Sequence, residues 1–121
     1  MKILLADNSS FMRGILKGIL KNGGYADAQI LEVEDGEAAV SQYNLEKPDL
    51  LLLDIIMPKK DGIAVLKEIG VSAPAIVVSA VGQQTLIDEA LKLGAKGFII
   101  KPFDAKQVIE TIQNVIVPKQ A

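Results

Sequence analysis

Side chains suited to phosphoryl chemistry follow four of the five short apolar runs in this 121-residue chain. In chain order, the polar residues at the ends of these runs are Asp7 and Asn8, Asp54, Ser79 and Lys101. Short apolar runs separated by helical patterns are typical of buried parallel strands, and an open α/β sheet binds ligands outside the carboxyl ends of its strands. We therefore expect two acids, an amide, a hydroxyl and an ammonium to meet at one edge of a sheet. These groups suit the formation of an aspartyl phosphate, which needs a carboxylate, a cation site, a hydroxyl and a lysine.

Five strands and five helices must position these groups. The predicted strands are residues 2–7, 29–33, 49–54, 75–79 and 97–101. Apolar residues with helical spacing lie between them, and right-handed crossovers place helices on both faces of a parallel sheet. The five-strand order 2-1-3-4-5, one of the two common doubly wound orders, fits this flavodoxin-like (βα)5 pattern. The first and third strands are then neighbours, and Asp7, Asn8 and Asp54 converge between them.

Capping and terminating residues set the limits of the predicted helices. Ser and Asp side chains can accept hydrogen bonds from the free N–H groups of a first helical turn, whereas Gly and Pro end helices. The apolar stripe predicted for the first helix consists of Phe11, Ile15, Leu16, Ile19 and Leu20. The predicted boundaries are Ser9 or Ser10 and Gly23-Gly24 for the first helix, Pro48 for the second, Asp61-Gly62 and Gly70 for the third, Gly94 for the fourth, and Asp104 and Pro118 for the fifth.

Composition limits the classes of protein to which the chain can belong. Half of the residues are hydrophobic, so we expect one folded domain over residues 1–121. The net charge of −2 disfavours nucleic acid as the main partner. The sequence has no Cys, His or Trp, which excludes disulfides, thiolate or imidazole metal ligands and histidine bases. No apolar stretch approaches the ~20 residues of a membrane span, and the first is too short for a signal peptide, so we expect a cytoplasmic protein without membrane insertion.

Four motifs together resemble a response-regulator receiver domain. They are ADNSSFMR (6–13), DIIMPKKDG (54–62), SAVGQQ (79–84) and KPF (101–103). The resemblance covers essentially the whole chain, including the spacing between motifs. SSFMR and SAVGQQ are more similar to single-domain chemotaxis receivers of the CheY type than to DNA-binding regulators.

The resemblance implies a role for each residue of the phosphoryl site. Asp54 would be the phosphoacceptor, a nucleophile that works only when its target is neutralised by a cation. Ser79 and Lys101 would bind the phosphoryl group, the lysine as a point charge. Ser79 and Phe98 would form the conformational switch, and Lys101–Pro102 would be a cis peptide.

The resemblance also implies a Mg²⁺ site, and here the chain departs from the family pattern. Asp7, Asn8, Asp54 and the backbone carbonyl of Ile56 would surround the ion, since Mg²⁺ takes carboxylate oxygens together with water and phosphate. Receivers usually carry two adjacent acids where this chain has Asp7 and Asn8. Because the neutral amide of Asn8 removes one negative charge, we expect weaker Mg²⁺ binding.

Each of these residues also has an ordinary structural explanation. Asp54 can cap a turn at a strand end, and Asp7 can favour the dipole of the following helix. Ser79 can be a turn serine, Lys101 a solvated lysine, and Phe98 a core residue. The metal-binding and phosphoryl explanations lead for the acids because all four motifs occur together, whereas the two explanations of Phe98 stay balanced.

The resulting functional hypothesis is a phosphorylated signalling switch that is not an enzyme for any separate substrate. Since this chain has no His, a partner histidine kinase would donate the phosphoryl group. The face formed by the fourth helix, fifth strand and fifth helix would then change its affinity for a downstream target, such as a flagellar motor or other signalling protein. We expect a monomer that binds no nucleic acid.

Three alternatives share the fold or the nucleophile. A degenerate receiver would bind a partner without phosphorylation, and Asn8 is its only support. A flavodoxin-type redox carrier would need a fuller phosphate loop than Ser9-Ser10 and aromatic residues around the flavin. A haloacid-dehalogenase-like phosphatase would need an acid two residues after Asp54, where this chain has Ile56.

Two apolar residues predict that a phosphoryl group, once attached, is lost slowly. In the family, the route of an attacking water is flanked by the residues two positions after the phosphoacceptor and two after the hydroxyl. Here these residues are Ile56 and Val81, and neither can hydrogen-bond a water.

Overall fold

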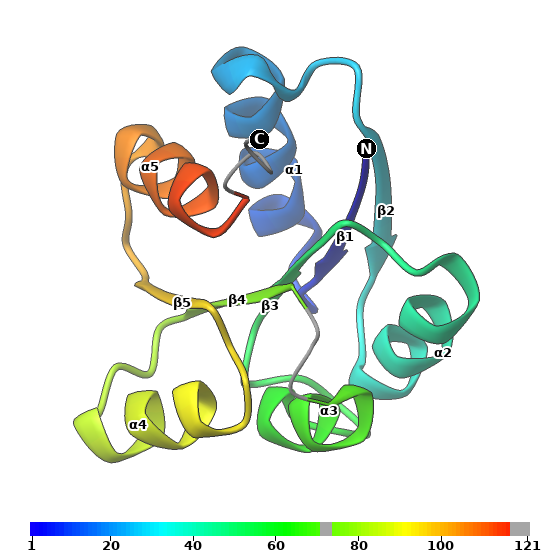
Figure 1. The fold of residues 1–121 in the computed structure, drawn as a ribbon, viewed down its shortest axis with the longest axis vertical. Coiled ribbons are helices and arrows are strands. Elements are labelled where there is room, and N and C mark those ends of the chain that lie inside the picture. The colour runs from blue at the N-terminus through cyan, green and yellow to red at the C-terminus, as the bar shows by residue number, and fades with distance from the viewer. Residues whose placement is uncertain (71–73, 117–121) are drawn as a thin grey trace, which may run out of the picture.

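The computed structural model describes residues 1–70 and 74–116, which contain a five-stranded parallel sheet (Figure 1). The strands are β1 (Lys2–Ala6), β2 (Gln29–Val33), β3 (Leu50–Leu53), β4 (Ala75–Ser79) and β5 (Gly97–Ile100). Their order is β2-β1-β3-β4-β5, and each neighbouring pair is parallel. The predicted flavodoxin-like architecture and strand order are confirmed.

A helix follows each strand. The α-helices are α1 (Ser10–Leu20), α2 (Gly36–Glu46), α3 (Gly62–Ile69), α4 (Gln84–Lys92) and α5 (Ala105–Val115). A π-helical turn, η1 (Lys21–Tyr25), continues α1 as far as Gly24, whose positive φ of 104° ends the helical path. The side chains of Ser9, Asp61 and Asp104 accept backbone N–H groups at the starts of α1, α3 and α5, as predicted. Asp35 caps α2 in the same way.

The helices bury both faces of the sheet. In Figure 1, α1 and α5 cover one face and α2, α3 and α4 cover the other. Successive strand side chains point to opposite faces, so Leu50 and Leu52 pack in one hydrophobic cluster and Leu51 and Leu53 in the other. This two-sided burial explains why β3 is an unbroken apolar run rather than an alternating one.

The predicted apolar stripe of α1 is correct only in part. Leu16 and Leu20 are buried, but Phe11 is 76% exposed and Ile15 is also exposed. Phe11 and Ile15 lie on a different side of the helix from Leu16 and Leu20, because each residue advances the helix by about 100°. Spacing alone could not separate these two sides.

Pro118, predicted to stop the fifth helix, lies outside the described residues. Among the described residues, none of the helices combines the length and apolar character needed to cross a bilayer.

Candidate functional site

The two acids named first lie side by side at the carboxyl edge of the sheet. Ala6 of β1 and Leu53 of β3 are paired in register, so the next residue of each strand, Asp7 and Asp54, emerges at the same level. The backbone N–H of Asp54 donates to the carbonyl of Ala6 at 2.9 Å, which extends the ladder past the end of the strands. Both aspartates are buried.

Lys101 lies between these two carboxylates. Its Nζ donates to Oδ2 of Asp7 at 2.9 Å and to Oδ2 of Asp54 at 3.0 Å. The side chains of Asp7, Asp54 and Lys101 are 3%, 9% and 15% exposed, so water screens these ion pairs poorly. The peptide between Lys101 and Pro102 is cis.

The two carboxylates favour the protonated form of Lys101. Burial by itself lowers the pKa of Lys101, but the hydrogen bonds and negative charges of Asp7 and Asp54 outweigh burial, and the pKa is raised above its ordinary value. The ammonium therefore stays charged throughout the neutral range. A permanent cation at this place can neutralise added phosphoryl oxygens.

Backbone N–H groups orient the other oxygen of each carboxylate. Oδ1 of Asp54 accepts the N–H groups of Ile55 at 2.7 Å and Ile56 at 3.4 Å. Oδ1 of Asp7 accepts the N–H of Ser9 at 2.9 Å. Each aspartate thus has one oxygen held by the backbone, while its second oxygen faces Lys101.

Ser79 is fully buried at the end of β4, next to Ile100 in the sheet register. Its Oγ accepts the N–H of Val81 at 3.2 Å, so the hydroxyl is presently part of a turn. Phe98 is half-buried and packs against the cluster on the α2–α4 face. Ile56, in contrast, is 60% exposed beside the acids and adds little to the core.

The oxygen atoms at this edge suit a hard divalent cation. Two buried carboxylates lie here, the exposed Asn8 directly follows Asp7 in the chain, and Mg²⁺ commonly uses one or two carboxylates together with waters. Within residues 1–70 and 74–116, three or more His, Cys, Asp or Glu never gather closely enough to hold an ion. The donor set therefore fits Mg²⁺ but supplies less negative charge than an acidic triad would.

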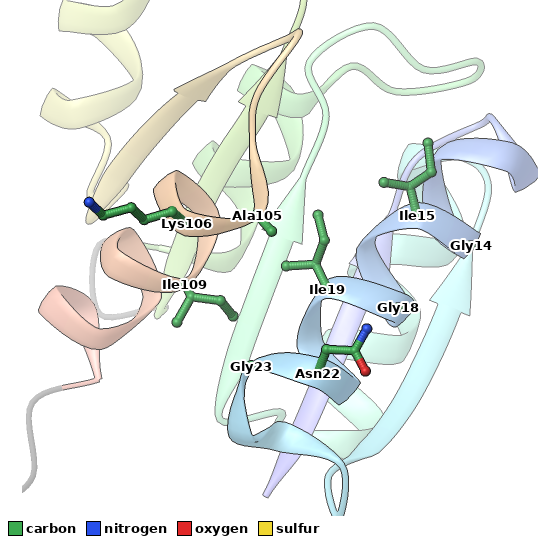
Figure 2. A pocket seen from close by; sticks show the side chains of 9 residues that line it. All are labelled: Gly14, Ile15, Gly18, Ile19, Asn22, Gly23, Ala105, Lys106 and Ile109. Atoms are coloured by element: carbon green, nitrogen blue, oxygen red, sulfur yellow. The ribbon is translucent and has the colours of Figure 1, made fainter.

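A cavity of about 490 Å³ lies away from these acids, between α1 and α5 (Figure 2). Gly14, Gly18 and Gly23 leave part of its wall without side chains, and Ile19 and Ile109 supply apolar surface. None of the predicted site residues lines it. The chemistry at the sheet edge is therefore separate from this hollow.

Arg13 and Glu32 are further neighbours of the site, which no sequence motif had assigned to it. A side-chain nitrogen of Arg13, Nη1, donates to the backbone carbonyl of Asp7 at 2.5 Å, and its Nε donates to Oε1 of Glu32 at 2.9 Å. Arg13 lies inside the motif 6–13, but Glu32 is on β2, nineteen residues later. Nothing in the sequence signals this pairing.

Comparison with known proteins identifies the family. Residues 3–113 match the response regulator receiver domain family, and the chain belongs to that family. Several of its relatives within the family are chemotaxis proteins named CheY. The chain is 42% identical over 118 residues to the chemotaxis protein CheY of Bacillus subtilis (strain 168), covering 95% of this chain and 97% of that protein. It is 43% identical over 117 residues to the CheY of Thermotoga maritima, covering 94% and 96%.

Solved structures of receiver domains have the same fold as this chain. The chain superimposes with a TM-score of 0.88 and 35% identity on a chain in the crystal structure of the CheX–CheY–BeF3–Mg²⁺ complex from Borrelia burgdorferi, covering 97% of this chain and 90% of that chain. It also matches the response regulator domain of Thermotoga maritima CheB, with a TM-score of 0.83 and 33% identity over 95% of each chain.

Proposed function

We propose that this chain, as one receiver domain over residues 1–121, accepts a phosphoryl group on Asp54 from a partner histidine kinase. The observation that carries the proposal is the buried pair of carboxylates bridged by the Lys101 ammonium at the carboxyl edge of the sheet. An isolated strand-end acid that only caps a turn would need no buried counter-charge from a residue 47 positions away. Family membership makes the same assignment the natural one.

The transfer forms one bond and breaks one bond. Oδ2 of Asp54 faces Lys101 and would form the O–P bond, while the N–P bond of the donor phosphohistidine breaks and the imidazole leaves. Lys101 would shift its hydrogen bonds to the new phosphoryl oxygens, which lie near the two carboxylates. The Oγ of Ser79 would release the N–H of Val81 and donate to the phosphoryl group instead.

A cation site would be completed by Asp7, Asp54, Asn8 and the carbonyl of Ile56. Bound Mg²⁺ would neutralise negative charge on the transferring phosphoryl group. Within residues 1–70 and 74–116, no group of three acids gathers at this site, so Asp7 and Asp54 supply its negative charge and we expect weak binding. Mg²⁺ is also named with CheY in the Borrelia complex, which supports this ion as the natural choice.

The output would be a changed affinity for a downstream protein in the cytoplasm. Movement of Ser79 and of Phe98, which packs under α4, would alter the face formed by α4, β5 and α5. Several relatives are chemotaxis proteins, so a flagellar motor component or another signalling protein is the partner we propose. We propose that the chain acts as a monomer, binds no nucleic acid and is not an enzyme for a separate substrate.

Mapping the adduct tests the assignment to Asp54. The chain is incubated with Mg²⁺ and a small acyl phosphate, and the modified peptide is located by mass spectrometry after reduction of the acyl phosphate. We expect the label on Asp54 and none in Asp54→Asn. Asp49→Asn is the matched control, since Asp49 is an exposed carboxylate that only accepts the N–H of Lys2. Equal labelling of Asp54→Asn and wild type would contradict the assignment.

A further inference from the structure

Arg13 joins helix α1 to the end of strand β1 through the backbone of Asp7. Its side chain is only 12% exposed, although it carries a permanent charge. A partly buried guanidinium is stabilised by hydrogen-bond acceptors, and two serve this one: the carbonyl of Asp7 at 2.5 Å and the carboxylate of Glu32 at 2.9 Å. Arg13 therefore makes specific hydrogen bonds with defined partners and is not a charge that simply faces solvent.

Four atoms of Asp7 are held by four different groups. Its N–H donates to the carbonyl of Val33, its Oδ1 accepts the N–H of Ser9, and its Oδ2 accepts the ammonium of Lys101. Its carbonyl accepts Arg13. If this carboxylate turned from Lys101 toward a cation, the Lys101 contact would weaken, and the backbone contacts would have to keep the residue in place.

Glu32 keeps Arg13 in this position. Its Oε1 accepts Nε of Arg13, and its Oε2 accepts Nζ of Lys17 at 2.7 Å. The hydrogen bond from Lys17, helped by Arg13, outweighs partial burial and lowers the pKa of Glu32. The carboxylate is thus charged at neutral pH, and it lies on β2, a fixed element of the sheet.

We propose that Arg13 is a positioning residue that holds Asp7 in the geometry for binding a divalent cation, with Glu32 as its anchor. The inference rests on the proposed function, because the cation site is part of it. The guanidinium acts through the backbone of Asp7 and touches no cation. Removing a group that orients a metal ligand in this way typically weakens metal binding by about tenfold or more.

The direction in which Mg²⁺ affinity changes when Arg13 is removed distinguishes a positioning role from a purely electrostatic one. A positive charge near the site repels Mg²⁺, so removing Arg13 as a charge alone would tighten binding. Removing it as a positioning group frees the carbonyl of Asp7 and loosens binding. The two explanations of Arg13 therefore predict opposite changes in the same dissociation constant.

The test is calorimetric titration of the unphosphorylated chain with MgCl₂. For Arg13→Met we expect about tenfold weaker binding, and Arg13→Lys should recover part of the loss. Lys17→Met is the matched control, since it removes one positive charge from the same carboxylate without touching Asp7. We expect its Mg²⁺ affinity to be unchanged or slightly higher. Thermal unfolding of each variant verifies that it is folded.

Unchanged or tighter binding by folded Arg13→Met would overturn the inference while leaving the proposed function intact. Failure of the wild-type chain to bind Mg²⁺ at all would overturn both. Where Arg13→Met does not fold, the double variant Glu32→Leu/Lys17→Met gives the test, because it removes the anchor, leaves Arg13 in place and keeps the net charge unchanged. Weaker Mg²⁺ binding by this folded double variant than by wild type supports the inference, and equal binding by the two overturns it.

Discussion

Replacing Lys101 by Met should destabilise the chain strongly in the absence of divalent cations. Methionine keeps most of the aliphatic length but removes the ammonium that contacts Asp7 and Asp54. The two carboxylates are 3% and 9% exposed, so they would be left as buried like charges without a counter-ion. The free energy of unfolding should therefore fall by the amount typical of breaking a buried ion pair.

The size of the effect follows from burial. Removing one partner of a buried ion pair typically lowers the free energy of unfolding by about 3–5 kcal/mol. Lys101 is 15% exposed, so its ammonium keeps some hydration, and we expect the lower end of that range, about 3 kcal/mol. For a domain of this size such a loss lowers the unfolding midpoint by about 10 °C.

The pH dependence of the wild type has a defined sign. The pKa of Lys101 is raised above its ordinary value of 10.5, so the folded state holds this proton more tightly than the unfolded state. The stabilisation is then fully present below pH 10.5 and is lost as the pH rises through the raised pKa. The difference between wild type and Lys101→Met should accordingly be constant near neutral pH and shrink in strong alkali.

Urea unfolding followed by circular dichroism, at neutral pH with a chelator, measures the effect. Lys106→Met is the control, because Lys106 is 82% exposed and lies 4.0 Å from Glu110, and exposed pairs contribute only about 0–1 kcal/mol. Mg²⁺ should stabilise Lys101→Met more than wild type, since a cation can then neutralise the vacant carboxylates. A Lys101→Met chain as stable as wild type in chelator would refute the reasoning.

Three further predictions concern the metal, the output face and the lifetime of the phosphoryl group. Asn8→Asp should bind Mg²⁺ more tightly than wild type in a calorimetric titration, since it adds a carboxylate to the exposed side of the site; no gain would contradict the charge argument. Lys92→Glu on α4 should weaken binding to the downstream partner in a pull-down while leaving phosphorylation unchanged, and loss of both would place Lys92 in the phosphoryl site instead. Ile56→Asn and Val81→Glu should release phosphate faster than wild type because polar side chains can orient water, and equal rates would show that these residues do not shield the site.

The sequence was sufficient for the architecture because its signals were local and consistent. Each strand is a short apolar run, and β3 is apolar at every position because both faces of it are buried. Ser9, Asp61 and Asp104 cap helices through their own side chains, an interaction that needs only neighbouring residues. Such signals can be recognised without knowing the rest of the fold.

The part of the site that depends on strand order could be predicted from the sequence. Asp7 and Asp54 follow central neighbouring strands, so their meeting was expected from strand order alone. The hydrogen bond that the backbone N–H of Val81 donates to Oγ of Ser79 could not be expected, because a hydroxyl oxygen can serve any nearby donor. The Arg13–Glu32 contact was equally hidden, since it depends on which side of α1 faces β2.

The most direct measurement is the intact mass of the wild-type chain after incubation with a small acyl phosphate, in Mg²⁺ and in chelator. The account predicts the addition of one phosphoryl group in Mg²⁺ and little or none in chelator, because Asp54 reacts only when its buried charge and that of the donor are neutralised. An unmodified mass in Mg²⁺, with the chain folded, would contradict the account and favour a receiver that binds its partner without phosphorylation.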